Sequence, residues 1–323
     1  MLNMPMDVLT QFPVRKTKLQ KQAFRAAVQS YAKDMGYACT VEEGNFGCRN
    51  LVIGDPGKAK YLVTANYDTG FSYLVPDYMT PCNPLLAVLG RVLLFGLYGL
   101  AVGTGCALIF ALFGLLFGVP FRNALALGLI FSPVPGFLVG FVLIPVILML
   151  FTSRMENRNC NTSGVVTLLE ILRTLPENQR HKVCFVLFDM AELGWIGSAS
   201  YRKSHPESAA QTVVNLNCVG DGDHLLFMPG NKLKKDSAAY RKLFKCCGYF
   251  GNKSLLVQEK GRSMHWMDYF AFPQGVGISA FRKTKKGMLY SRVHHAQDRN
   301  LDETNVNILR AAVTTLICSD AAQ

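Results

Sequence analysis

Residues that could bind a metal ion, attack a substrate or transfer a proton lie in short polar segments of an apolar sequence. The main ones are Asp68, Cys160, Glu192 and His294. Carboxylates and imidazoles can bind divalent metal ions or transfer protons, and a thiolate can bind metal or act as a nucleophile. For Cys160 three roles stay open: a small buried thiol, a metal ligand, or a nucleophile with His294 or His295 as its base.

These residues follow stretches that are expected to form strands. Runs rich in β-branched and aromatic residues predict strands at Lys60–Tyr67, Lys182–Asp189, Thr212–Val219 and Gly277–Phe281. Apolar residues at helical spacing predict a helix over Thr162–Leu175, whose first residues, a Thr and a Ser, are suited to capping its start. The alternation predicts an α/β domain in which helices cover a sheet.

A last helix is expected over Glu303–Cys318. Asp302 and Glu303 stand at its start, where negative charge is favoured by the helix dipole. The sequence contains no internal repeat and no glycine-rich loop of the dinucleotide-binding kind. Nucleotide binding is therefore not indicated.

Four motifs, in order along the chain, resemble those of the zinc-dependent aminopeptidase and glutaminyl cyclase superfamily, and a closing segment follows them. They are Val63–Thr69, Asn159–Val165, Phe188–Gly194, Val214–Gly220 and the closing His294–Asp298. The resemblance covers most of the chain outside Leu85–Phe151. It implies a mixed β-sheet sandwiched by helices, with the active site at the ends of neighbouring strands.

At the first metal position the resemblance implies that ligands have been lost. Asn66 stands where the family has a metal-binding His, two residues before Asp68, which in the family orients that His. Asn217 stands where the family has a metal-binding Asp. Because a neutral amide is a poor zinc ligand, a two-zinc centre is not expected.

At the second metal position the resemblance leaves part of a ligand set. Cys160 replaces the family's bridging Asp, whereas Glu192 and His294 match retained ligands. The alternatives are one zinc held by sulfur, oxygen and nitrogen, or no metal. Ala191 stands where the family has its general-base Glu, and losing such a base slows a reaction by about 10²–10⁴-fold. Little hydrolytic activity is expected.

The stretch Leu85–Phe151 is expected to enter a membrane. It contains no Asp or Glu, and its basic residues are Arg91 and Arg122. Two apolar runs, 85–117 and 124–151, are each long enough to cross a hydrocarbon layer of about 30 Å. The sequence predicts a transmembrane helical hairpin.

The hairpin would interrupt a single soluble domain, made of residues 1–84 and 152–323. Arg154 and Arg158 follow the second run, so the positive-inside rule places this domain in the cytoplasm of a multi-pass protein. The ten cysteines show no disulfide-framework spacing, which fits a reducing compartment. Met1–Leu19 does not resemble a signal peptide.

Charge and composition limit the classes of partner that this protein is expected to bind. The chain has 34 Lys and Arg against 22 Asp and Glu, with 50% hydrophobic residues. Beside a membrane segment, a basic surface favours anionic lipid, and no nucleic-acid partner is expected. The expected partners are the lipid bilayer and a peptide or protein.

Three functions remain open. The leading hypothesis is a membrane-anchored pseudo-peptidase that has little hydrolytic activity and binds peptides or protein partners. The second is a one-zinc hydrolase or acyl transferase that uses Cys160, Glu192 and His294. The third is a subunit of a membrane complex whose hairpin carries the function.

Overall fold

A computed structural model describes most of the chain outside the second apolar run. The described residues are 2–70, 77–79, 83–118, 120–123, 125–126, 158–233, 235–258, 267–285, 287–293 and 298–319. The chain divides into two compact units. The first is Met1–Pro84 with Arg154–Gln323, and the second is Leu85–Ser153.

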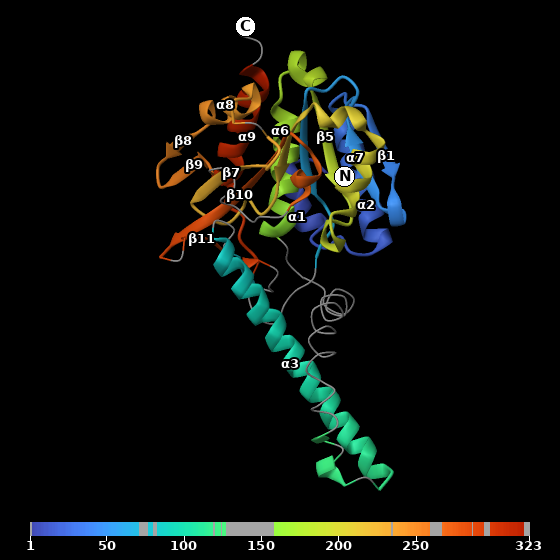
Figure 1. Cartoon of the computed structure of the whole chain (residues 1–323). Helices are drawn as coiled ribbons and strands as arrows, with labels where there is room; N and C mark the ends of the chain where they lie inside the picture. Colours follow the sequence, from blue (N-terminus) through green and yellow to red (C-terminus); the bar gives the residue numbers. More distant parts are fainter. Residues whose placement is uncertain are drawn as a thin grey trace. The chain divides into compact units, whose positions relative to one another are not determined.

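The first unit contains a mixed sheet of eleven strands (Figure 1). The strands are β1 (Cys39–Glu43), β2 (Arg49–Ile53), β3 (Tyr61–Asn66), β4 (Asp77–Met79), β5 (Val183–Phe188), β6 (Thr212–Leu216), β7 (His224–Pro229), β8 (Gly248–Phe250), β9 (Lys253–Val257), β10 (Gly275–Thr284) and β11 (Gly287–Val293). Their main order is β1-β2-β5-β3-β6-β10-β7-β9-β8, and β11 pairs with β10 and β4. The central strands β5, β3, β6 and β10 run parallel.

Helices cover the sheet, and short helical turns connect the elements. The helices of the first unit are α1 (Val8–Gln11), α2 (Lys18–Asp34), α6 (Gly164–Thr174), α7 (Ile196–Ser204), α8 (Ala238–Lys245) and α9 (Glu303–Cys318). The turns are η1 (Pro5–Asp7), η2 (Asn45–Gly47), η3 (Asn159–Ser163), η4 (Glu177–Lys182), η5 (Ala191–Leu193), η6 (Pro206–Ala209) and η7 (Asp268–Ala271).

Alternating side chains of the central strands pack into two cores, one on each face of the sheet. On β5, Phe185 joins the larger core with α2, α6, α8 and α9, whereas Val186 joins a smaller core with Tyr201 of α7. Val63 and Leu62 of β3 divide in the same way. This period of two is the geometry of a strand buried on both faces.

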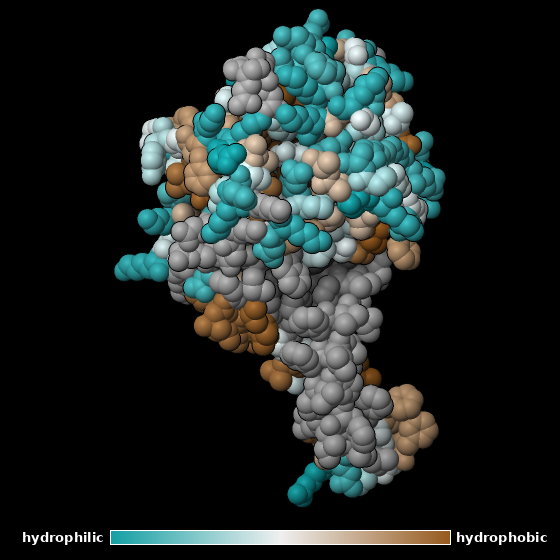
Figure 2. Space-filling model, turned by 45° about the horizontal axis from the view of Figure 1, so that its top comes forward, coloured by the Kyte–Doolittle hydropathy of each residue, from teal (hydrophilic) through white to brown (hydrophobic). Residues whose placement is uncertain are grey.

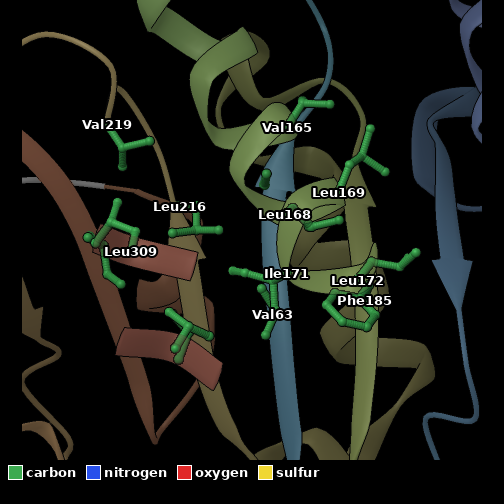
Figure 3. Close-up of a cluster of buried hydrophobic side chains, with 14 of the residues drawn as sticks. Val63, Val165, Leu168, Leu169, Ile171, Leu172, Phe185, Leu216, Val219 and Leu309 are labelled. Carbon is green, nitrogen blue, oxygen red and sulfur yellow. The ribbon is translucent and has the colours of Figure 1, made fainter. Parts of the chain in front are cut away.

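The larger core lies between α6, α9 and the central strands. Figure 3 shows Leu168 and Ile171 of α6 directed at Val63 and Leu216, with Leu309 of α9 beside them. All five side chains are fully buried. The apolar packing holds the carboxyl ends of the central strands in register with the start of α6.

The predicted mixed sheet flanked by helices is confirmed. The predicted strands correspond to β3, β5, β6 and β10, and the last helix has the predicted bounds. Asp302 caps that helix, because its side chain accepts a hydrogen bond from the Thr304 amide at 2.8 Å.

The predicted capping of α6 by its first hydroxyls is wrong. The Ser163 hydroxyl forms no cap hydrogen bond to the helix. It donates instead to the Asn159 carbonyl at 2.5 Å and accepts the Val219 amide at 2.9 Å. The Ser163 hydroxyl therefore joins the loop after β6 to the start of α6 instead of capping the helix.

The second unit contains α3 (Pro84–Leu116). By length and composition, its stretch Leu85–Gly114 is the one helix among the described residues that could cross a membrane, with a mean hydropathy of 2.1. Large apolar side chains such as Leu93 and Leu116 are exposed along it. The predicted second span, 124–151, lies almost wholly outside the described residues.

The surface of the first unit has a different character. Figure 2 shows its coloured face as predominantly hydrophilic. Its exposed large apolar residues are scattered, and they include Phe46, Leu193 and Tyr249. This composition is normal for a water-facing surface.

Candidate functional site

The carboxyl ends of three adjacent parallel strands bring the predicted site residues to one edge of the sheet. Asn66 is the last residue of β3, Asp189 follows β5 and Asn217 follows β6. Because β3 pairs in parallel with both β5 and β6, these ends lie next to one another. In open α/β sheets this edge is where ligands commonly bind.

Two loops are locked together beside this edge. The Asn159 side-chain oxygen accepts the Gly220 amide at 2.8 Å, while Ser163 accepts the Val219 amide. Gly164, the first residue of α6, lies so close to β6 that a β-carbon would stand 2.3 Å from the Leu216 carbonyl oxygen. Glycine is required for this close approach, which fixes η3 against the loop after β6.

Cys160 lies between these loops and is anchored by a buried carboxylate. Asp298 accepts the backbone amides of Asn159 and Cys160, each at 3.1 Å. The Cys160 thiol, 2% exposed, donates to the Asn161 side-chain oxygen at 3.3 Å. The thiol of Cys218, also 2% exposed, lies within hydrogen-bonding reach of Cys160 and donates to Asn217 at 3.1 Å.

The Glu192 carboxylate accepts a hydrogen bond from a neighbouring side-chain amide. The Asn161 side-chain nitrogen donates to Glu192 at 3.2 Å and to the Asp68 carbonyl at 2.9 Å. A β-carbon on Gly70 would stand 2.4 Å from the carboxyl carbon of Glu192, so the carboxylate packs directly against the backbone. The Asn161 amide contacts both Cys160 and Glu192.

Asp68 is a buried carboxyl whose charge is poorly compensated. Burial raises its pKa to about 7; Lys21 opposes this, while Glu192 and Asp189 add to it. The Glu192 amide donates to one Asp68 oxygen at 3.4 Å. The other oxygen has no hydrogen-bond partner among the described residues. The Lys21 ammonium forms an ion pair with the Asp189 carboxylate, with a nitrogen-to-oxygen distance of 2.5 Å. The Asp68 carboxyl therefore titrates near neutral pH.

A second buried carboxyl, Asp268, lies beside the first metal position. Burial raises its pKa to about 6, partly offset by the nearby Ser198 hydroxyl and Asn66 amide. By hydrogen-bond geometry, neither of its carboxyl oxygens has a partner in the described part of the chain. The Asn66 side-chain oxygen, which is also buried, is likewise unsatisfied there.

Ala191, which stands where the resemblance places the general base, is the first residue of η5. Ala191 is 8% exposed, and its methyl group can neither accept nor return a proton. Next to it, Leu193 and Trp195 expose 44% and 36% of their surface. The rim of the edge is therefore apolar, where a catalytic carboxylate is expected from the resemblance.

An N-terminal arginine ties this edge to the rest of the domain. Arg15 is fully buried, and its guanidinium donates to the Tyr67 carbonyl at 2.5 Å and to the Thr162 hydroxyl at 2.8 Å. It also donates to the Phe12 carbonyl. Burial lowers the pKa of Arg15 to about 10. The arginine joins the end of β3 to η3.

These residues do not fit a pair of zinc ions. Asn66 and Asn217 offer neutral amides, which are poor zinc ligands. The buried side-chain oxygen of Asn66 has no hydrogen-bond partner among the described residues. Within the described ranges, no group of three or more His, Cys, Asp and Glu side chains is arranged to hold a metal. His294 lies outside the described residues. The one-zinc set Cys160, Glu192 and His294 therefore stays a prediction.

Comparisons with known proteins match this architecture. Residues 159–317 match Peptidase family M28. This family belongs to the zinc-dependent exopeptidase superfamily that the sequence motifs resemble. No curated protein gives a significant match to the chain.

Solved structures show the same zinc-exopeptidase fold at low identity. An aminopeptidase of Legionella pneumophila superposes with a TM-score of 0.55 and 10% identity, over 99% of this chain and 70% of that one. Glutaminyl cyclase of Porphyromonas gingivalis gives 0.54 and 14%, over 98% of both chains. Glutaminyl cyclase of Fimbriiglobus ruber gives 0.52 and 14%, over 98% of this chain and 94% of that one.

Four residues at this edge were given no role from the motifs, although Asn161, Cys218 and Asp298 lie within them and only Asp268 lies outside. Asn161, Cys218, Asp268 and Asp298 contact or flank the predicted positions. Cys218 directly follows Asn217 in the sequence, and Asn161 directly follows Cys160. Adjacency to a substituted metal position was the available signal for both residues.

Proposed function

We propose that this protein is a membrane-anchored, zinc-peptidase-like protein with little hydrolytic activity that binds a peptide or protein segment at the rim of the former active site. The observation that carries the proposal is the replacement of charge by neutral groups at the strand ends. Asn66 and Asn217 stand at the first metal position, and Ala191 stands at the position of the base.

The hydrogen-bond pattern supports a site that no longer activates water. Asn161 contacts both the Cys160 thiol and the Glu192 carboxylate. A thiol that donates to a neutral amide oxygen is protonated, and a protonated thiol is a poor metal ligand. Without a general base or a fixed metal, attack of water on a peptide bond loses its two main sources of acceleration.

Binding is supported by the apolar rim. Leu193 directly follows the retained Glu192 and Trp195 lies three residues beyond it, and both side chains are substantially exposed. A bound peptide would cover these side chains, and Glu192 could pair with its positively charged amino terminus. Interfaces draw much of their energy from such aromatic residues. A peptide with a free amino terminus and an apolar first residue is therefore the proposed ligand class.

Membrane anchoring is supported by α3 and by the absence of acidic residues between Leu85 and Phe151. A helix of 30 residues is about 45 Å long, which exceeds the hydrocarbon thickness of about 30 Å. We propose two crossings, with the peptidase-like domain on the cytoplasmic side. Labelling of single introduced cysteines in intact and permeabilised cells tests that orientation.

Peptide binding can be followed through Trp195. The sequence has two tryptophans, so Trp266→Phe leaves Trp195 as the single reporter. Detergent-purified protein is titrated with a library of short peptides that differ in their first residue and in amino-terminal acetylation. We expect a saturable fluorescence change for free amino termini, weakened at least tenfold by Glu192→Gln or Leu193→Ala.

The control is Tyr249→Ala, which removes a large side chain on β8 that is more exposed than Leu193, at 80% against 44%. This variant should bind peptide like the parent. If acetylated and free peptides bind alike, or if Leu193→Ala and Tyr249→Ala have equal effects, the rim is not the binding site and the proposal fails.

A further inference from the structure

The amino ends of two central strands bring together lysines that are far apart in the sequence. Lys60 directly precedes β3, and Lys182 directly precedes β5. The Lys60 amide donates to the Lys182 carbonyl at 2.8 Å, so the backbones of the two residues are adjacent. Because β3 and β5 are parallel, both lysines lie at the end of the sheet opposite to the candidate site. Lys60 is exposed and Lys182 is half-buried.

The helix α8 adds two further lysines at this end. The Lys242 ammonium donates to the Tyr61 hydroxyl at 3.4 Å, and Tyr61 is the first residue of β3, next to Lys60. Tyr61 is 2% exposed in the larger core, so its position is fixed. Lys245 follows Lys242 by three residues on α8 and therefore lies about one helical turn away. We call Lys60, Lys182, Lys242 and Lys245 the lysine cluster.

The segments that carry the lysine cluster are rich in positive charge. They contain no Asp or Glu, and they are residues 56–67, 178–188 and 237–258. The acidic residues just before the first two segments pair with other cations. Asp55 pairs with Lys58 at 3.3 Å, and Glu177 pairs with Arg180 at 3.7 Å. The local sequence therefore leaves an excess of positive charge at this end of the sheet.

The electrostatics of Lys242 agree with this geometry. Burial lowers its pKa, and the positive charges of Lys60, Lys245 and Lys182 lower it further. Like charges that are held together repel one another and destabilise the compact state, and a bound anion removes that cost. The lysine cluster therefore favours a negatively charged ligand.

The chemistry of lysine favours phosphate among the possible anions. A lysine ammonium is a compact point charge with three donors, and it is a common phosphate ligand, whereas planar carboxylates are best matched by the forked guanidinium of arginine. A phosphomonoester carries a charge of about −1.5 to −2 at neutral pH. Four lysines therefore match the charge of about two phosphate groups.

We propose that the lysine cluster binds a ligand that carries two or more phosphate groups, either a soluble molecule or the headgroup of a lipid. The ammonium groups bind the phosphate oxygens through charge-assisted hydrogen bonds, and no covalent bond changes. β3 has six residues, so its two ends lie about 20 Å apart. The phosphate site is therefore separate from the rim at the carboxyl ends, and it does not depend on peptide binding.

The first experiment compares phosphate compounds by isothermal titration calorimetry on detergent-purified full-length protein. We expect saturable binding of tripolyphosphate, at least about tenfold tighter than that of orthophosphate and weakened by added salt, since salt screens exposed charges. A short-chain phosphatidylinositol bisphosphate and its water-soluble headgroup separate the two sources. Equal affinity for both supports a soluble ligand, and affinity at least tenfold tighter for the lipid supports a lipid headgroup.

The second experiment locates the site with variants. Lys60→Gln combined with Lys242→Gln should weaken tripolyphosphate binding at least about tenfold. Lys60→Arg combined with Lys242→Arg keeps the charge and should retain most of the affinity. The matched control is Lys18→Gln with Lys283→Gln, which removes two exposed lysines from α2 and β10 and should bind like the parent. Unfolding temperatures of all variants identify any loss of binding that reflects misfolding.

Three results would overturn the proposal. The first is the absence of saturable binding of tripolyphosphate and of the bisphosphate lipid to the parent. The second is parental affinity in the folded Lys60→Gln, Lys242→Gln variant, or an equal loss in the Lys18→Gln, Lys283→Gln control, because net charge alone would then explain the binding. The third is tighter binding of a polyglutamate peptide than of tripolyphosphate, which would indicate an acidic protein partner instead.

Discussion

The middles and the carboxyl ends of the central strands differ in the kind of side chain that they carry. Val63, Phe185 and Val214 lie in the larger core and are buried; Figure 3 shows Val63 and Phe185 in it. A few residues further along, Asn66 and Asn217 stand at positions that carry metal ligands in the superfamily the chain resembles. The strand middles hold an apolar scaffold, whereas the strand ends hold neutral groups where the resemblance places charged ones.

The comparison teaches that folding and chemistry are carried by separable sets of residues. Packing requires apolar side chains of suitable volume, and it is indifferent to what stands beyond the strand end. The metal positions instead required carboxylates and imidazole, whose burial is costly without a cation. Neutral amides at Asn66 and Asn217 avoid that cost while leaving the scaffold intact.

The largest expected effect comes from restoring the charged set at the strand ends. We predict that Asn66→His, Cys160→Asp, Ala191→Glu and Asn217→Asp combined raise aminopeptidase turnover in the presence of zinc by at least about 10²-fold. Release of a chromogenic amine from aminoacyl substrates measures it. A folded quadruple variant with parental turnover would show that more than these positions has changed.

The strand middles should respond to a packing change. Phe185→Ala removes a fully buried ring from the larger core, and we expect it to lower the free energy of unfolding by about 3–5 kcal/mol. Phe250→Ala, at a half-exposed ring on β8, should change it by less than about 0.5 kcal/mol. Denaturant titration compares them, and equal effects would contradict the assignment of this core.

Asp298 supports the site without belonging to the family's metal positions. Asp298→Ala leaves the backbone amides of Asn159 and Cys160 buried without their acceptor, which should lower stability by about 1–3 kcal/mol. Asp298→Asn keeps one acceptor oxygen and should cost less. The same unfolding measurement ranks the two variants. An Asn variant weaker than the Ala variant would mean that the carboxylate has another role.

The smallest effect concerns pH and the buried carboxyl of Asp268. Burial raises its folded-state pKa to about 6 from an ordinary value near 3.9. Between these values the folded chain binds more protons than the unfolded chain, so stability falls as pH rises from about 4 to about 6. Asp268→Asn should flatten this part of the profile and be more stable than the parent at pH 8.

The measurement is thermal unfolding of both proteins across pH 4–8. Asp68, whose pKa is raised to about 7, keeps a second decline in both profiles, because the variant leaves it unchanged. Parallel profiles for the two proteins would show that Asp268 is charged throughout, with a compensating partner.

Much of the scaffold could be predicted because its signals are local. Apolar periodicity gave the strands β3 and β5 and the helix α9 with close bounds. The helix α2 was missed although Thr17 and Gln20 form a capping box and Phe24, Val28 and Tyr31 repeat at helical spacing. That helix was readable from the sequence.

The site was less predictable because its contacts join distant segments. The meeting of Cys160 with Cys218 depends on how η3 lies against the loop after β6, and no local pattern specifies that. The same holds for Asp298, whose carboxylate accepts amides of η3. The motif resemblance identified the substituted positions, but it could not indicate which side chains from distant segments contact them.

The most direct test of the central claim is peptide hydrolysis by the purified protein itself. Turnover of a panel of aminoacyl substrates and of an amino-terminal glutaminyl peptide is measured with added zinc, for the parent chain and for Glu192→Ala. The account predicts that both proteins remain at the same background rate. Substantial turnover by the parent that Glu192→Ala abolishes would contradict it, because the retained carboxylate would then serve catalysis.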